Sequence, residues 1–420
     1  MTTRNIDTAA PTSARLQAGQ RISEIDILRG LVIVLMALDH VRDFFIAGGS
    51  FAVNPLDPTQ TTPLLYVTRW VTHLCEPTFV FLTGVSAYLQ LIKGKAAPNL
   101  SMFLLTRGLW LIFLELTLIS FGWSFGFPYA PFMQVIWAIG WSMIALAALV
   151  WLPRLVVLGI GIAIIAGHNL LDPINAQALG EQNAALGHLW TFLHDGGVVF
   201  IGEQPIGLAA YPILPWIGVA AFGYGLGAIF LSEKRNRIVP MLGIGMLALF
   251  VVLRWFNAYG DPQFAAGPEA VARLWTEQPT LMARVMVFLD VQKYPPSLQF
   301  VLVTLGLVFV LWPLLSRLPR AVTSVLNTFG AVPFFFYVLH IYLVHLLAIA
   351  ANLAFGRDAR GLFNWLINGF THPEYSTNTG FALFPWTYVA WIVVLALLYP
   401  LCRYWQGVKA RRRDWWLSYL

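Results

Sequence analysis

Ten long apolar stretches dominate the sequence and leave few choices for its fold. Each is close to the length of about 20 residues that a helix needs to cross a bilayer. They lie near residues 27–46, 71–92, 101–121, 131–151, 155–171, 211–231, 238–257, 297–315, 329–353 and 384–404. Charged residues make up only 11% of the chain, whereas they make up about 25% of a soluble protein. We therefore expect an all-α polytopic membrane protein, a bundle of about ten transmembrane helices.

The short connections between these stretches indicate how the chain is oriented. Their basic residues are Lys93 and Lys95, Arg154, Lys234, Arg235 and Arg237, Arg317 and Arg320, and the group from Arg403 to Arg413. If the N-terminus is cytoplasmic, all of them lie on the cytoplasmic side, as the positive-inside rule requires. The net charge of +6 is therefore a topology signal, and we expect no nucleic-acid partner.

The same pattern divides the chain into a core and two tails. Residues 1–20 are polar and contain no apolar run, so we expect a disordered cytoplasmic tail there. The transmembrane domain is expected over 21–405, and 406–420 reads as a basic cytoplasmic tail. The longer connections, 172–210, 258–296 and 354–383, then face outward. An amphipathic helix is expected in 258–296, with Val271, Leu274, Trp275, Val285 and Phe288 on its apolar face.

The first apolar stretch is unusual because it is rich in ionisable residues. It carries Arg29, Asp39, His40, Arg42 and Asp43, and such groups are costly at hydrocarbon depth unless they face a protein interior or a ligand. Arg29 and His40 are eleven residues apart, so they share one helix face about 16 Å apart along the axis. Asp43 lies near the same face and could hold the His40 imidazole. A cation at one end and a base at the other suit a long ligand.

These residues also carry a resemblance to a known family. The Arg29-x10-His40 spacing resembles the first-helix signature of membrane acyltransferases that act on sugars. Five ordered blocks resemble the heparan-α-glucosaminide N-acetyltransferase catalytic-domain family: RISEIDILRGLVIVLMALDH at 21–40, PTFVFLTGVSA at 77–87, YPILPWIGVAAFGYGLG at 211–227, KYPPSLQFVLVTLG at 293–306 and VPFFFYVLHIYLVH at 332–345. The chain departs from the family in the loop 50–70, which lacks the catalytic histidine that the eukaryotic enzyme has there.

The resemblance implies a membrane-embedded acyltransferase that moves an acetyl or other acyl group from cytoplasmic acyl-CoA to a sugar amine or hydroxyl outside. We expect His40 to be the catalytic base, assisted by Asp43 and Asp39, with direct transfer or an acylated histidine as alternatives. Arg29 is expected to bind a coenzyme A phosphate; its alternative role is an interfacial anchor. The resemblance also implies a bacterial cytoplasmic (inner) membrane protein.

Further polar residues are candidates for binding the acceptor. His73 and Glu76 share a face of the second helix on the outer side, and His73 is an alternative base. His194 in the outer loop, Lys293 and His340 complete the candidate set. His340 and His345 are about 140° apart on a helix, and no spacing matches a zinc motif, so we expect no metal.

A second function remains open from the sequence. A non-catalytic transporter or flippase of a small or lipid-linked solute would use the same polar interior as a passage. Cleavage of a thioester by the purified protein distinguishes the two, because a transporter does not break its solute.

Overall fold

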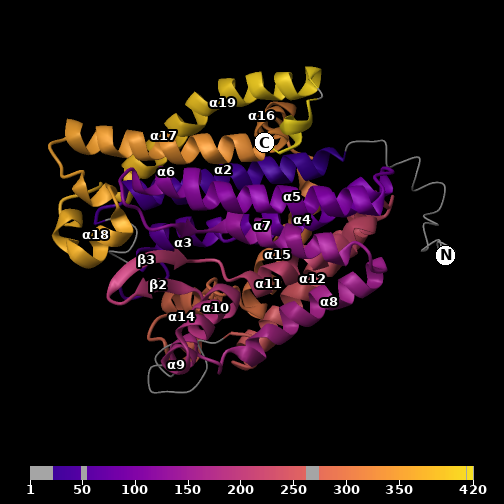
Figure 1. Cartoon of the computed structure of the whole chain (residues 1–420), viewed down its shortest axis with the longest axis horizontal. Coiled ribbons are helices and arrows are strands. Elements are labelled where there is room, and N and C mark those ends of the chain that lie inside the picture. The colour runs from indigo at the N-terminus through magenta and orange to yellow at the C-terminus, as the bar shows by residue number, and fades with distance from the viewer. Residues whose placement is uncertain (1–21, 49–53, 262–273, 413, 420) are drawn as a thin grey trace.

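The computed structural model of the protein describes residues 22–48, 54–261, 274–412 and 414–419. Its long helices run roughly parallel (Figure 1). They are α2 (Ser23–Phe45), α4 (Cys75–Ile92), α5 (Ala97–Leu114), α7 (Val135–Leu149), α8 (Arg154–Gly167), α11 (Ile213–Leu226), α12 (Arg235–Trp255), α15 (Leu298–Leu315), α17 (Pro333–Ala354) and α19 (Tyr388–Arg411). Shorter helices are α3 (Pro63–Thr72), α6 (Ser120–Ser124), α9 (Ala176–Gln182), α10 (Ala184–Trp190), α14 (Leu281–Leu289), α16 (Arg320–Ala331) and α18 (Trp365–Thr371).

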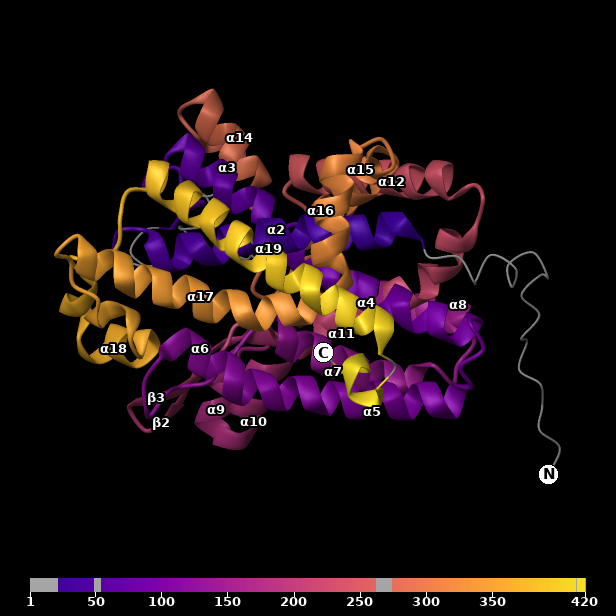
Figure 2. The same ribbon diagram turned by 90° about the horizontal axis from the view of Figure 1, so that it is seen from above.

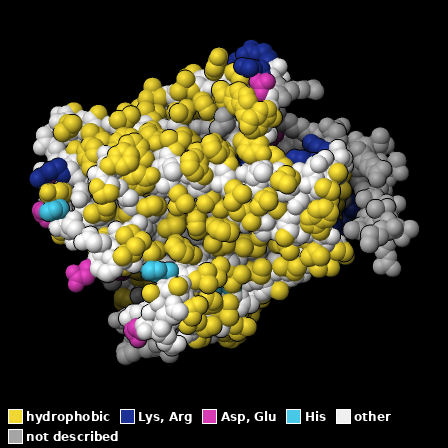
Figure 3. All heavy atoms as spheres, in the orientation of Figure 1, with side chains coloured by type: hydrophobic (Ala, Val, Ile, Leu, Met, Phe, Trp, Pro, Cys, Tyr) yellow, Lys and Arg dark blue, Asp and Glu magenta, His cyan; other side chains and the backbone are white. Residues whose placement is uncertain are grey.

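Each of the ten predicted apolar stretches contains a helix, although 131–151 begins with a short strand at Phe132–Met133, and the all-α polytopic membrane fold is confirmed. Eight segments of the described chain are long and apolar enough to cross a membrane: Pro63–Ile92, Ala97–Ser124, Arg154–Leu171, Ile213–Leu231, Arg235–Trp255, Leu298–Leu315, Pro333–Ala354 and Leu383–Arg411. The other two are α7, which is apolar but 15 residues long, and α2, whose 23 residues include several charges. Apolar side chains form a broad band over the face seen in Figure 3, with the charges toward its margins.

Glycines allow the central helices to approach closely. A Cβ on Gly84 of α4 would lie 1.9 Å from the Ala220 carbonyl oxygen of α11, and one on Gly223 of α11 would lie 2.1 Å from that of Phe81. In the absence of a hydrophobic driving force between helices inside a bilayer, such backbone contact is a main source of association. The α4–α11 pair thus forms the centre of the bundle.

The basic ends of the helices gather at one end of the molecule. Arg235 at the start of α12 lies 3.6 Å from Glu24 at the start of α2. Arg154 at the start of α8 donates to the Gly225 carbonyl at the end of α11, and the Trp312 indole of α15 donates to Asn236. The beginning of α2 and the end of α19 lie near this end as well (Figure 2). This arrangement agrees with the distribution of positive charge in the sequence.

The opposite end carries structure that the sequence did not predict. Strands β1 (Phe132–Met133), β2 (Gly197–Ile201) and β3 (Gln204–Ala209) form a sheet in the order β1-β3-β2, with β2 and β3 antiparallel and β1 and β3 parallel. The connection 172–210 therefore holds α9, α10 and a hairpin. In 258–296 the predicted amphipathic helix is the short α14, and Val271 lies outside the described residues.

Two element boundaries also differ from the prediction. The expected stretch 329–353 begins at Pro333, and a separate helix, α16, precedes it and crosses α2. A Cβ on Gly330 of α16 would lie 2.0 Å from the Asp26 carbonyl oxygen, so this crossing is as close as that of α4 and α11. Helix α19 continues to Arg411, beyond the expected domain boundary at 405. The expected tail 1–20 lies outside the described residues.

Candidate functional site

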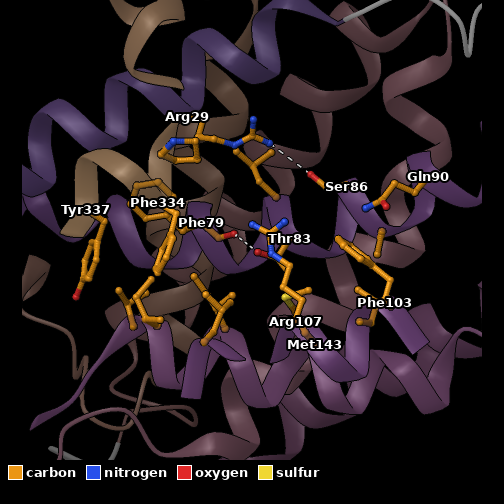
Figure 4. Close-up of a pocket in the computed structure, with 18 of the residues that line it drawn as sticks. Arg29, Phe79, Thr83, Ser86, Gln90, Phe103, Arg107, Met143, Phe334 and Tyr337 are labelled. Carbon is orange, nitrogen blue, oxygen red and sulfur yellow. Dashed lines mark hydrogen bonds between the residues drawn. The ribbon is translucent and has the colours of Figure 1, made fainter. Parts of the chain in front are cut away.

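A cavity of about 300 Å³ opens between α2, α4, α5, α7, α17 and the end of α19. Figure 4 shows Arg29 of α2 and Arg107 of α5 approaching it from opposite sides, with Tyr337 at one end and Gln90 and Phe103 at the other. Most of the wall is apolar, including Leu82, Leu111 and Ile136. Such a long, mostly apolar cavity with a few polar groups is the usual form of a small-molecule site.

The part of the cavity away from Tyr337, toward Gln90 and Phe103, is strongly cationic, and we call it the cationic end. Arg29, Arg107 and Lys409 line it, and no Asp or Glu is among the described residues of the lining. The three cations lie close enough to influence one another electrostatically. Arg29 also pairs with Asp26 at 3.0 Å and donates to the Ser86 hydroxyl at 3.4 Å. The guanidinium of Arg107 donates to the Ser418 carbonyl of the C-terminal turn (Trp415–Ser418). This end is suited to an anion.

The other end of the cavity approaches a pair of histidines. Met36 and Tyr337 line the cavity, and they lie about one helical turn before His40 on α2 and His340 on α17. The Nδ1 atom of His40 lies 2.7 Å from the Nε2 atom of His340. Both rings are buried, and the Tyr337 ring is 6.2 Å from His40 and 5.4 Å from His340. Sequence analysis placed His340 with the acceptor, whereas the structure pairs it with His40.

The hydrogen bonds of this pair define the tautomers of its neutral form. The Nδ1 atom of His340 faces the Phe336 carbonyl oxygen at 3.2 Å, and a carbonyl only accepts, so Nδ1 carries the hydrogen. The Nε2 atom of His340 then accepts the hydrogen on Nδ1 of His40. It follows that Nε2 of a neutral His40 keeps a lone pair. The pair thus leaves His40 in the tautomer that a proton acceptor needs.

Asp39 and Asp43 have partners other than the His40 ring nitrogen. Asp39 accepts from Arg69 at 2.9 and 2.7 Å and from the Thr72 hydroxyl at 2.9 Å, and Arg42 approaches it to 3.0 Å. Asp43 pairs with Arg42 at 2.5 Å. The partner of the His40 Nδ1 atom is His340, and the expectation that Asp43 assists His40 stays a prediction. A carboxylate as fully bonded as Asp39 anchors the two arginines.

The predicted acceptor residues Glu76 and Lys293 meet in the structure. The Lys293 ammonium lies 2.8 Å from Oε1 of Glu76, and the Tyr211 hydroxyl donates to the same oxygen at 3.0 Å. All three side chains are buried. Oε2 of Glu76 and both ring nitrogens of His73 are buried and make no hydrogen bond with the described residues. This cluster therefore has unused polar groups that a ligand could satisfy.

His194 belongs to a different cluster. Its ring lies 3.0 Å from Asp195, 3.0 Å from the His168 carbonyl and 3.5 Å from Asp172. Burial lowers the pKa of His194, but the bonds to Asp195 and His168 and the charge of Asp172 outweigh this and raise the pKa above its ordinary value. The prediction that His194 binds the acceptor with His73 and Glu76 therefore has no contact to support it among the described residues.

Sequence reasoning missed Arg107, Lys409 and Tyr337 as lining residues. Arg107 is a single cation within an otherwise apolar helix, which was a usable signal, but its alignment with Arg29 depends on how α2 and α5 pack. Lys409 was one of several basic residues near the C-terminus, and Tyr337 was one of 14 tyrosines. Nothing in the local sequence separated these two from the others.

The fold and the site are those of a polytopic helical membrane protein that encloses a cavity with one cationic end and one end near a histidine pair. The profile of the family described as heparan-alpha-glucosaminide N-acetyltransferase, catalytic, matches residues 21–256. The chain belongs to this family, which is one of membrane acetyltransferases. No curated protein sequence matches the chain. The matched range includes Arg29, His40 and Glu76, whereas Lys293 and His340 lie beyond it.

Proposed function

We propose that the protein transfers an acyl group, acetyl in the simplest case, from cytoplasmic acyl-CoA to an amine or hydroxyl of a sugar on the other side of a bacterial cytoplasmic membrane. The observation that carries the proposal is the cavity itself. It joins three cations at one end to the neighbourhood of the His40–His340 pair at the other.

The cationic end suits the nucleotide part of acyl-CoA. Coenzyme A carries several phosphate charges, and its flexible arm ends in the reactive thioester. Arg29 and Arg107 provide planar guanidinium groups for phosphate oxygens, and Lys409 adds a point charge. The apolar wall beyond them suits the arm. Arg29 and His40 are about 16 Å apart along α2, which suits a donor bound at one end and reacting at the other.

The histidine end suits general-base catalysis. Nε2 of His40 takes the proton from the acceptor amine or hydroxyl as the acceptor attacks the thioester carbonyl. The carbon–sulfur bond breaks, the coenzyme A thiolate leaves, and His40 returns the proton to that sulfur. His340 keeps His40 in the required tautomer through its bond to Nδ1. In the alternative route the acyl group rests first on His40, and the acceptor attacks this acyl-histidine.

The cluster of Glu76, His73 and Lys293 suits the acceptor. A sugar offers several hydroxyl or amine groups that both donate and accept. Oε2 of Glu76 and the two ring nitrogens of His73 are buried without partners, and such groups bind a polar ligand at little further desolvation cost. We propose that they orient the acceptor, with Lys293 and Tyr211 fixing the carboxylate of Glu76.

Acyl transfer by the purified protein tests the proposal against the transporter alternative. The detergent-purified full chain is mixed with acetyl-CoA and an amino sugar, and the release of free thiol and the acetylated sugar are measured. The proposal expects both products in equal amounts. Solute uptake by proteoliposomes without thiol release would overturn it. Protein-bound label after incubation with labelled acetyl-CoA alone would assign the acyl-histidine route.

The donor end is tested by substitutions of its cations. Arg29→Ala and Arg107→Ala should each weaken acetyl-CoA binding by roughly 10-fold or more, because a hydrogen bond to a charged group contributes about 1.5–3 kcal/mol. Arg29→Lys should restore part of the loss. Lys93→Ala is the matched control, since Lys93 is exposed in the connection between α4 and α5 and does not line the cavity. If both alanine variants bind acetyl-CoA as tightly as the parent does, the donor assignment fails and Arg29 returns to the role of an interfacial anchor.

A further inference from the structure

Two histidines and an aspartate converge near the outer end of α8, apart from the site described above. His168 begins the short turn His168–Leu171 that follows α8, Asp172 comes next, and His194 lies in the turn Thr191–Asp195. One possible ligand atom from each residue lies within 4.8 Å of the other two. No local sequence pattern indicates this group, because His168 and His194 are 26 positions apart.

Asp195 orients the ring of His194. One Asp195 oxygen accepts from Nδ1 of His194 at 3.0 Å, and the other accepts from the Ala176 amide at 2.7 Å. Nδ1 therefore carries a hydrogen, and Nε2 is directed toward the Asp172 carboxylate at 3.5 Å and the His168 carbonyl at 3.0 Å. A carboxylate that holds Nδ1–H is the usual outer partner of a metal-bound histidine.

Three acceptors thus face one another around Nε2 of His194: the nitrogen itself, a carboxylate oxygen and a carbonyl oxygen. They require a positive charge among them, which is either a proton on Nε2 or a metal ion. The surroundings of the His168 ring distinguish the proton from the metal ion. The ring is 2% exposed, and the partner that it has is the Pro296 carbonyl, which can satisfy only one of the two ring nitrogens. A proton on His194 leaves the other nitrogen of His168 without a partner, whereas a metal ion binds it.

The distances are suited to a small transition-metal ion. Zinc binds histidine nitrogen at about 2.0–2.1 Å and carboxylate oxygen at about 2.0–2.2 Å, so tetrahedral ligands lie about 3.4 Å apart. Nε2 of His194 and the Asp172 oxygen are 3.5 Å apart. All the possible ligand atoms of the group lie within 4.8 Å of one another, so side-chain shifts of roughly 1 Å bring them to the spacing of a tetrahedral site.

We propose that His168, Asp172 and His194 bind one divalent metal ion of the zinc type, with Asp195 as the outer partner of His194. Two imidazoles and one carboxylate leave the fourth tetrahedral position open to water. The ion connects the end of α8 to the segment between α10 and β2. Asn169, next to His168, accepts from the Leu298 amide at 3.0 Å, so the metal site also braces the start of α15, which follows the Lys293 loop.

Metal content and thermal stability of the purified chain test the site without reference to activity. The full chain is stripped with a chelator and then titrated with ZnCl₂. We expect about one tightly bound zinc per chain and a higher melting temperature on its addition. His168→Ala, His194→Ala and the near-isosteric Asp172→Asn should each bind zinc at least 10-fold more weakly. His188→Ala, in the same outer connection, and His372→Ala, beside Glu374, are matched controls and should bind zinc as the parent does.

The dependence on pH distinguishes the metal from the proton. Because protons compete for Nε2, zinc should stabilise the chain more as the pH rises. In the proton account His194 has a raised pKa, so its stabilisation is present at low pH and is lost as the pH rises through that pKa. A chain that takes up no stoichiometric zinc at pH 8, or one whose zinc binding is unchanged in both His168→Ala and Asp172→Asn, would overturn the proposal.

Discussion

His40 is the proposed base, and its neighbours hold its ring in place. On one side its Nδ1 is held by His340, and on the other the Trp123 ring packs edge-on at 5.1 Å. Its neighbour Asp39 binds Arg69, Arg42 and Thr72, which connects α2 to α3 at the level of the histidines. A base held in one tautomer within such a packed environment needs little reorganisation during a proton transfer.

We expect His40→Ala to fold and to bind acetyl-CoA but to transfer acyl groups roughly 10²–10⁴-fold more slowly, which is the usual contribution of a general base. His340→Ala should lose less, because it removes only the partner that sets the tautomer. His73→Ala should mainly raise the acceptor concentration needed for half-maximal rate. Steady-state transfer by each detergent-purified variant, with its melting temperature recorded alongside, provides the measurement.

Asp43→Asn is the matched comparison on the same helix. Asp43 pairs with Arg42, so its neutral replacement should reduce the rate less than His40→Ala does. Normal transfer by His40→Ala together with an inactive His73→Ala would move the base to the junction of α3 and α4.

Site residues that lie on one helix could be predicted from the sequence, whereas contacts between distant segments could not. Arg29 and His40 are on one helix, so their shared face follows from helix geometry alone. The pairing of Glu76 with Lys293, and of His40 with His340, joins residues 217 and 300 positions apart, and no local pattern encodes such a contact. Arg107 was visible as an isolated cation, but only packing aims it at the cavity.

Among the elements, glycines allow two close helix crossings. The α4–α11 and α2–α16 crossings bring backbone against backbone, and α2 and α4 both line the cavity. The sequence contains several glycines in 211–227, and one of them, Gly223, makes the α11 side of the α4–α11 contact. The sequence did not predict α16, because a helix of 12 residues between two spans is too short to give a membrane signal.

Gly84→Ala should therefore destabilise the protein by about 1–3 kcal/mol, the usual cost of overpacking. Its Cβ would meet the Ala220 carbonyl at 1.9 Å, and that backbone can move only with α11. Gly245→Ala in α12 is the matched control, since no atom lies within 4 Å of its Cβ. Alanine there should stabilise by about 0.5–1 kcal/mol, because it lowers the entropic cost of a helical glycine.

Thermal unfolding in detergent compares the two glycine variants. A melting temperature for Gly84→Ala at or above that of the parent would contradict the backbone contact between α4 and α11. The opposite signs expected for the two substitutions exclude a general effect of alanine in helices.

At the scale of the whole molecule, the charge pattern and the fold both distinguish the same two ends of the bundle. The basic connections, the start of α2 and the end of α19 gather at one end, and the sheet and α18 lie at the other (Figures 1 and 2). The number of helices and their order follow from hydropathy, since the bilayer imposes a length and an apolar surface on each span. The sheet and the outer helices could not be predicted in this way, because outside the bilayer those constraints do not hold.

This difference between the two ends predicts the membrane topology. Reporter fusions after residue 235 and at the C-terminus should report cytoplasmic, and fusions within 172–210 should report the outer side, because the positive-inside rule retains basic connections in the cytoplasm. The ion pair between Arg235 and Glu24 requires the start of α12 and the start of α2 to lie on the same side. A fusion after Asn54, which follows α2, serves as the control and should report outside. A cytoplasmic signal from 172–210 would mean that the protein has the opposite orientation in the membrane. The cationic end of the cavity would then face away from cytoplasmic acyl-CoA, and the donor assignment would fail.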